Sequence, residues 1–113
     1  ALYCGNDDQT VPMLALGACG VISVLSNVLP AETVKMCRLF FDGKISESAA
    51  MQCDFVPLIS ALFSDVNPIP VKEARAMLGY CTDEMRLPLV GLDAAKKEAL
   101  RARLCEAGLH PVL

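Results

Sequence analysis

Strand-like sequence is confined to the first thirty residues of this chain, and this limits what the chain can fold into. Residues 1–5 and 20–25 are short apolar runs bounded by turn residues, a pattern typical of strands buried on both faces of a parallel sheet. Helical patterns follow at about 9–16 and 30–41, so we predict a right-handed βαβα unit. Two parallel strands alone do not make a stable sheet, so we expect them to pair with another copy of the chain or with the rest of a larger sheet.

The sequence after residue 43 predicts helices and no further strand. A helix capped by Ser46 carries an apolar stripe at helical spacing, formed by Met51, Phe55, Leu58 and Leu62. Pro57 lies inside this helix and is expected to kink it, because proline removes one backbone hydrogen bond and crowds the preceding turn.

Two later helices have clear start and stop signals. Pro70 suits the first turn of one helix. Asp93 is a good N-cap for the last helix, and Gly108 ends it. Leu109 is placed to pack back on Leu104, as a Schellman ending prefers.

Composition excludes several classes of protein. The formal net charge is −3 and the pI is about 5.0, which argues against a nucleic-acid-binding surface. Charges or prolines interrupt every apolar run before it reaches a membrane span, and no signal peptide is visible. Hydrophobic residues make up 54% of the chain and mean hydropathy is +0.44, so we expect some apolar surface to be covered by other protein.

The cysteines do not have metal-site spacing. Neighbouring cysteines are at least fifteen positions apart, whereas zinc sites and redox pairs need at least one short spacing. We therefore expect free thiols, a reducing, cytoplasmic location, and neither a metal nor a cofactor. The six positions are Cys4, Cys19, Cys37, Cys53, Cys81 and Cys105.

Four motifs in series give the sequence a specific likeness. They are YCGNDD at 3–8, LGACGVISV at 16–24, NPIPVK at 67–72 and RLPL at 86–89. Their order and spacing resemble the dihydrodipicolinate synthase family, and the resemblance covers essentially the whole chain. The second motif is shared with the wider pyruvate-aldolase superfamily, including N-acetylneuraminate lyases, whereas the third and fourth are more typical of the synthases.

The resemblance implies a fold and a reaction. The family fold is a (β/α)8 barrel with a small helical C-terminal domain, usually assembled as a homotetramer. Residues 1–43 would then be the last two βα units of an α/β barrel, with strands seven and eight, and 44–113 the all-α C-terminal domain. The family condenses pyruvate with aspartate semialdehyde through a lysine Schiff base. That lysine lies upstream of Ala1 in the family layout, so we nominate no catalytic residue here and expect the chain alone to be inactive.

Three residues carry over as expected site residues. Gly5, at the end of strand seven, would leave room for substrate, and Ile22, on strand eight, would help to hold pyruvate through main-chain and apolar contacts. Asn67 could support the pocket or satisfy local backbone donors, and both readings stay open. Where the family commonly has Ser-Gly-Asp-Asp, this chain has Cys4 before Gly5 and Asn6 after it, which puts any polar role of these two side chains in doubt.

Other reactive residues have simpler interpretations. Asp7 and Asp8 could act as an acid–base pair, but we expect them to cap a helix. Lys72 invites a Schiff-base role, yet its place in the first turn of a helix favours a structural or solvent-facing one. His110 is expected in a solvated tail. The basic residues of the last helix are expected to be an ordinary solvated face; they are Lys96, Lys97, Arg101 and Arg103.

Two rival functions remain open at the level of sequence. One is a neuraminate-lyase-like or sugar-acid aldolase, which fits the second motif but fits residues 67–72 less well. The other is a non-catalytic structural fragment that associates with itself through exposed strands, motivated by the high apolar content and the open strand edges.

Overall fold

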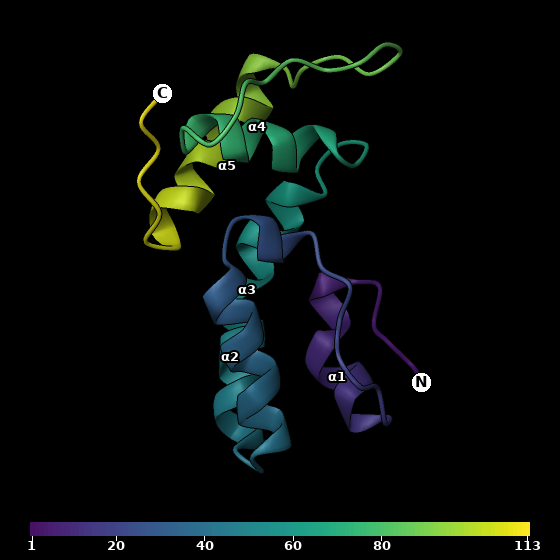
Figure 1. Cartoon of the computed structure of the whole chain (residues 1–113). Helices are drawn as coiled ribbons and strands as arrows, with labels where there is room; N and C mark the ends of the chain where they lie inside the picture. Colours follow the sequence, from purple (N-terminus) through teal and green to yellow (C-terminus); the bar gives the residue numbers. More distant parts are fainter. The chain divides into compact units, whose positions relative to one another are not determined.

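The computed structural model describes all 113 residues and divides them into two compact units, Ala1–Val56 and Pro57–Leu113. Figure 1 labels the α-helices of both units. The division falls inside one long helix. The domain boundary expected after residue 43 rests on the family resemblance and stays a prediction.

The first unit is built from helices and helical turns. In chain order these are the 3₁₀-helix η1 (Asp7–Gln9), α1 (Thr10–Ala15), the 3₁₀-helix η2 (Leu25–Asn27), α2 (Pro30–Phe41) and the first part of α3 (Ile45–Leu62). The predicted helices at about 9–16 and 30–41 are confirmed, and Pro30 opens α2 as a first-turn proline should.

The predicted strands are wrong in extent. The two segments do run parallel, but they form one bridge, between Cys4 and Val21. The main-chain N–H of Cys4 donates to the Gly20 carbonyl at 2.9 Å, and the N–H of Ile22 donates to the Cys4 carbonyl at 2.8 Å. Residue 25, expected to end the second strand, starts η2 instead. The carboxylate of Asp7, which lies just after the first segment in η1, accepts from the N–H groups of Val24 and Leu25 where η2 begins.

The core of the first unit lies between the helices and this bridge. α1 packs beside α2, and the hydroxyl of Ser48 on α3 donates to the main-chain oxygen of Met36 on α2 at 2.8 Å. Figure 1 shows α2 and the first part of α3 side by side. The buried apolar residues are Cys4, Val11, Leu14, Ala18, Leu25, Val28, Leu29 and Met36.

The second unit contains the end of α3, α4 (Ile69–Met77) and α5 (Ala94–Glu106), and α4 packs against α5. The predicted helix starting near Pro70 is confirmed. The interior is apolar, and its buried residues include Leu58, Leu62, Ile69, Val71, Ala74, Met77, Leu92, Leu100 and Leu104. No helix combines the length and the apolar character that a membrane crossing needs.

Local signals set both ends of α5. The carboxylate of Asp93 accepts from the N–H of Lys96 at 2.8 Å, so the predicted N-cap is confirmed. At the other end, Gly108 has a φ of +81° and Leu109 N–H donates to the Leu104 carbonyl at 3.0 Å. This is the bond of a Schellman ending, also as predicted.

Two details of α3 differ from expectation. Ser46 does not cap the helix, because α3 already begins at Ile45 and Ser46 lies within its first turn. Pro57 lies inside the helix as expected. The kink expected there stays a prediction.

Candidate functional site

The two site residues expected in the first unit lie at the same edge of the parallel bridge. Gly5 directly follows Cys4, and Ile22 directly follows Val21. Because parallel segments run in the same direction, both residues lie at the carboxyl end of the pair. We call Gly5 and Ile22 together the carboxyl edge.

The carboxyl edge is open. The side chain of Ile22 is 72% exposed, which is high for a large apolar residue. A Cβ atom added at Gly5 would meet nothing within 4 Å. The N–H of Ile22 is used by the Cys4 carbonyl. The edge therefore offers apolar surface and free space, and not a hydrogen-bond donor from Ile22.

Asp7 holds the chain that follows the carboxyl edge. Its side chain accepts from the hydroxyl of Ser23, from the N–H of Val24 at 2.8 Å and from the N–H of Leu25 at 3.0 Å. Asp7 is only 2% exposed. These three hydrogen bonds let Asp7 fix the backbone after Ile22.

This arrangement corrects the capping expectation. Gln9 is the N-cap residue of α1, but its side chain makes no capping hydrogen bond. Asp7 instead caps the turn that leads into η2, sixteen to eighteen residues further along the chain. Asp8 is exposed, so the two carboxylates do not form a buried acid–base pair.

Gln52 supports Asp7 from α3, a role that the sequence did not reveal. The amide nitrogen of Gln52 donates to the main-chain oxygen of Asp7 at 2.9 Å. Its amide oxygen accepts from the N–H of Val11 at 3.0 Å. Gln52 is 6% exposed, so these are buried hydrogen bonds. The contact spans more than forty positions, and no local pattern signals it.

Cys4 and Asn6, the two residues beside Gly5 that differ from the family pattern, have different surroundings. The thiol of Cys4 is buried and donates to the main-chain oxygen of Asn6 at 3.0 Å. The side chain of Cys4 therefore serves the turn and does not face the carboxyl edge. Asn6 itself is exposed.

Asn67 belongs to the second unit, so a shared site with Gly5 and Ile22 stays a prediction. Within its own unit Asn67 is exposed and precedes Pro68, the N-cap residue of α4. Lys72, in the first turn of α4, is half-exposed and its ammonium donates to the main-chain oxygen of Glu84. These surroundings lack the apolar burial that a Schiff-base lysine needs.

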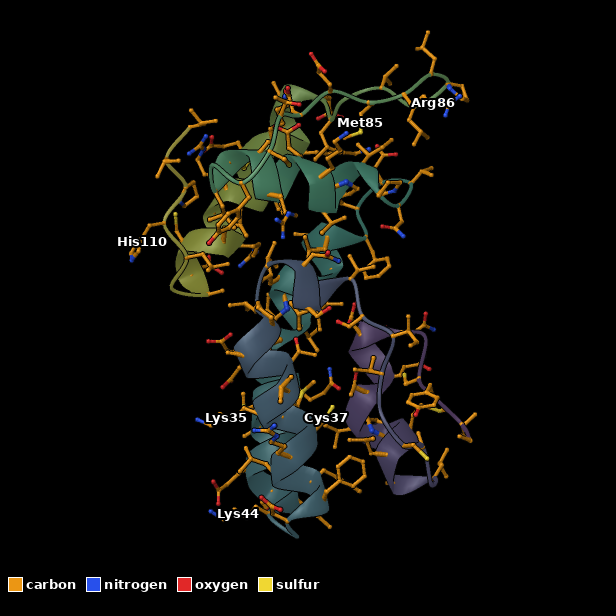
Figure 2. All side chains as sticks on the ribbon, in the orientation of Figure 1. Lys35, Cys37, Lys44, Met85, Arg86 and His110 are labelled. Carbon is orange, nitrogen blue, oxygen red and sulfur yellow. The ribbon has the colours of Figure 1, made fainter.

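Each basic residue of α5 already binds an oxygen acceptor in the protein. Lys96 binds Asp65 at 2.6 Å, and this hydrogen bond raises the pKa of Lys96. Arg103 binds Glu106 at 2.6 Å. His110 is exposed on the C-terminal tail and points away from the ribbon in Figure 2.

The cysteines make no disulfide. All six are free, and no group of three or more potential ligands could hold a metal ion. Burial is the main cause that raises the pKa of the Cys37 thiol, with a smaller contribution from Cys4. Figure 2 shows Cys37 on α2.

Comparison with known proteins identifies the family. Residues 1–107 match the family model of the dihydrodipicolinate synthetase family. The chain is 44% identical over 109 residues to the 4-hydroxy-tetrahydrodipicolinate synthase of Caldicellulosiruptor saccharolyticus, covering 96% of this chain and 37% of that protein. It is 42% identical over 109 residues to the enzyme of the same name from Clostridium perfringens, covering 96% of this chain and 38% of that protein.

Solved structures agree with the sequence comparison. The dihydrodipicolinate synthase of Thermotoga maritima matches with a TM-score of 0.94 and 44% identity, covering 96% of this chain and 37% of that chain. The enzyme of Aquifex aeolicus matches with a TM-score of 0.93 and 39% identity. The chain thus spans little more than a third of these relatives' length. On this basis the chain belongs to the dihydrodipicolinate synthetase family.

Proposed function

We propose that this chain forms one wall of the pyruvate site in a lyase that condenses pyruvate with aspartate semialdehyde, in lysine and diaminopimelate biosynthesis. The relatives' shared name, 4-hydroxy-tetrahydrodipicolinate synthase, supports the reaction class. The observation that carries the proposal is the carboxyl edge, where the exposed side chain of Ile22 adjoins the open space at Gly5.

The chemistry of this edge suits one part of pyruvate. Ile22 offers an apolar side chain, and its N–H is already used. The edge would therefore contact the methyl and carbonyl carbons, whereas donors for the pyruvate carboxylate would come from elsewhere. Asp7 and Gln52 would act indirectly, because they hold the backbone next to Gly5 and Ile22.

We place the Schiff-base lysine outside this chain. An iminium between a lysine and pyruvate acts as an electron sink, so the methyl group of pyruvate becomes a nucleophilic enamine that attacks the aldehyde. Lys72 lacks the apolar burial that this role needs. The chain alone is expected to be inactive.

The proposal includes an architecture. Residues 1–43 would supply strands seven and eight of a (β/α)8 barrel, with 44–113 as its helical C-terminal domain. Active sites of such barrels lie at the carboxyl ends of the strands, which supports the placement of Gly5 and Ile22. The partner of the open bridge would be the N-terminal part of the barrel, and the assembled enzyme would be a cytoplasmic homotetramer.

A chimera tests the function directly. The 113 residues replace the matching segment of the Thermotoga maritima relative, so that the rest of the barrel is present. We expect the chimera to condense pyruvate with aspartate semialdehyde and not to cleave N-acetylneuraminate. Cleavage of the sugar acid without condensation would instead support the neuraminate-lyase alternative.

Two further measurements locate the chemistry. Ile22→Ala in the chimera should raise the KM for pyruvate about tenfold, as the loss of an apolar pocket contact does. Leu16→Ala, at an equally exposed leucine at the end of α1, should leave it unchanged. Borohydride trapping with pyruvate should label a lysine outside the 113 residues, and a stable adduct on Lys72 would overturn the assignment.

A second candidate, self-association without catalysis, is favoured by exposed apolar side chains in the first unit. Leu16 and Ile22 are more than 70% exposed, and Tyr3, Phe41 and Ile45 are more than half exposed. Sedimentation of the chain alone would help to distinguish self-association from the proposed lyase function. A stable oligomer that binds no pyruvate and a chimera without activity would favour this candidate.

A further inference from the structure

The second unit contains a cavity that the proposed function does not use. It has a volume of about 540 Å³ and is lined by residues of α4, residues 81–83, residues of α5 and Leu113. This volume is in the range of small-molecule sites. Its polar lining residues are Glu73, Thr82, Asp83, Lys97, Glu98 and Arg101.

Glu73 is the distinctive residue of this cavity. It is only 5% exposed, although carboxylates are almost never buried without full pairing. Its Oε1 atom is 3.1 Å from the ammonium of Lys97. Its Oε2 atom is buried and has no hydrogen-bond partner in the protein. A buried acceptor in this state favours any ligand that brings a donor to it.

The charges in the wall indicate what kind of donor fits. Three carboxylates line the cavity, on Glu73, Asp83 and Glu98, against two cations. Both cations are engaged. The ammonium of Lys97 is shared between Glu73 and Asp83, at 3.1 and 3.5 Å, and the guanidinium of Arg101 donates to the main-chain oxygen of Leu113. An anionic ligand would meet an excess of negative charge, whereas a cationic donor would balance it.

We propose that this cavity binds a small primary ammonium compound. Its N–H group donates to Oε2 of Glu73, and its short alkyl part packs on the apolar lining from Ala76, Met77 and Ala94. The site shares no residue with the carboxyl edge, so it stands independently of the proposed lyase function.

Titration of the full 113-residue chain with three matched probes tests the proposal. Propylammonium, propan-1-ol and propionate have similar size and differ in charge. We expect propylammonium to give saturable amide shifts at Glu73, Met77 and Thr82, with affinity at least about tenfold above that of propanol. Propionate should give none. Equal binding of propanol and propylammonium, or no saturable shift at these residues, would overturn the proposal.

Removing one charge identifies the acceptor. Glu73→Gln should weaken propylammonium binding about tenfold or more, whereas Glu106→Gln, on α5 outside the cavity, should leave it unchanged. Equal affinities in the two variants would mean that Glu73 is not the acceptor and that the proposal is wrong. If Glu73→Gln does not fold, the preference of the wild-type chain for propylammonium over propanol decides alone.

Discussion

The side-chain amide of Gln52, on α3, binds the main-chain oxygen of Asp7 at 2.9 Å. The same amide accepts from the N–H of Val11 in the first turn of α1 at 3.0 Å. One side chain thus caps a helix from another helix and holds the residue that positions the carboxyl edge. Helix N-termini leave backbone donors unpaired, and Gln52 supplies the acceptor that no local residue provides.

Gln52→Leu should therefore destabilise the chain. The substitution keeps a side chain of similar size but leaves a buried oxygen of Asp7 and a buried N–H of Val11 unpaired. We expect a loss of about 1–3 kcal/mol in the free energy of unfolding, measured by urea denaturation. Gln9→Leu, at an exposed glutamine, is the matched control and should change the free energy by less than about 0.5 kcal/mol. Equal effects of the two substitutions would contradict the capping role.

Asp7→Asn tests the other half of this network. An amide has one acceptor oxygen, so its NH₂ group would face either the N–H groups of Val24 and Leu25 or the Ser23 hydroxyl, which would then lose its acceptor. We expect a loss of about 2–3 kcal/mol of stability, in the range for buried hydrogen bonds to a charged group. Asp8→Asn, at the exposed neighbour, should be nearly neutral. A neutral Asp7→Asn would mean that the carboxylate does not hold η2.

The sequence predicted those parts of the fold that local chemistry determines. Pro30, Asp93 and Gly108 act within one helical turn, so the ends of α2 and α5 could be predicted. The extent of the strands could not be predicted, because it depends on the segments with which they pair. The two parallel segments form one bridge, and the carboxylate of Asp7 binds the second segment where η2 begins. No local pattern reveals an acceptor that reaches sixteen or more positions along the chain.

The site shows the same division. Gly5 and Ile22 were predicted through the resemblance of motifs, and their place at one edge follows from a parallel pairing that the sequence also indicated. Gln52 and Glu73 were missed. Each is an ordinary polar residue on a helix, and only the packing of a second element makes it buried.

Acid should weaken the chain partly through Asp65. The hydrogen bond from Lys96 lowers the pKa of Asp65 below its ordinary value of 3.8, with a further contribution from the N–H of Val66. A lowered folded-state pKa adds stability above the unfolded-state value, and this is lost as pH falls through the folded-state value. Asp65→Asn should therefore show a smaller fall in melting temperature than wild type between about pH 4 and pH 2.

Two controls accompany this measurement. Lys96→Met removes the partner and should also reduce the dependence on acid, because it removes the main cause of the shift. Asp54→Asn, at an exposed aspartate on α3, should follow the wild-type curve. Identical curves for wild type and Asp65→Asn would show that this pair does not contribute to the acid dependence.

Thiol labelling should distinguish the cysteines. Burial raises the pKa of Cys37, so a smaller fraction of it is the reactive thiolate near pH 8, and it is also less accessible than Cys53 on the exposed face of α3. We expect iodoacetamide to modify Cys37 roughly threefold or more slowly than Cys53, followed by peptide mass spectrometry. Equal rates in the folded chain would contradict the burial of Cys37, and equal rates in urea are the expected control.

Gly5 should be replaceable for folding but not for catalysis. Nothing lies within 4 Å of an added Cβ, so Gly5→Ala should change the stability of the 113-residue chain by less than about 0.5 kcal/mol. Gly108→Ala, where φ is +81°, should cost about 1–2 kcal/mol, because a side chain is strained in that conformation.

In the Thermotoga maritima chimera, Gly5→Val should raise the KM for pyruvate about tenfold by filling the proposed pocket. An unchanged KM would mean that the space over Gly5 does not hold substrate, and a large loss of stability from Gly5→Ala would show that Gly5 serves the fold instead.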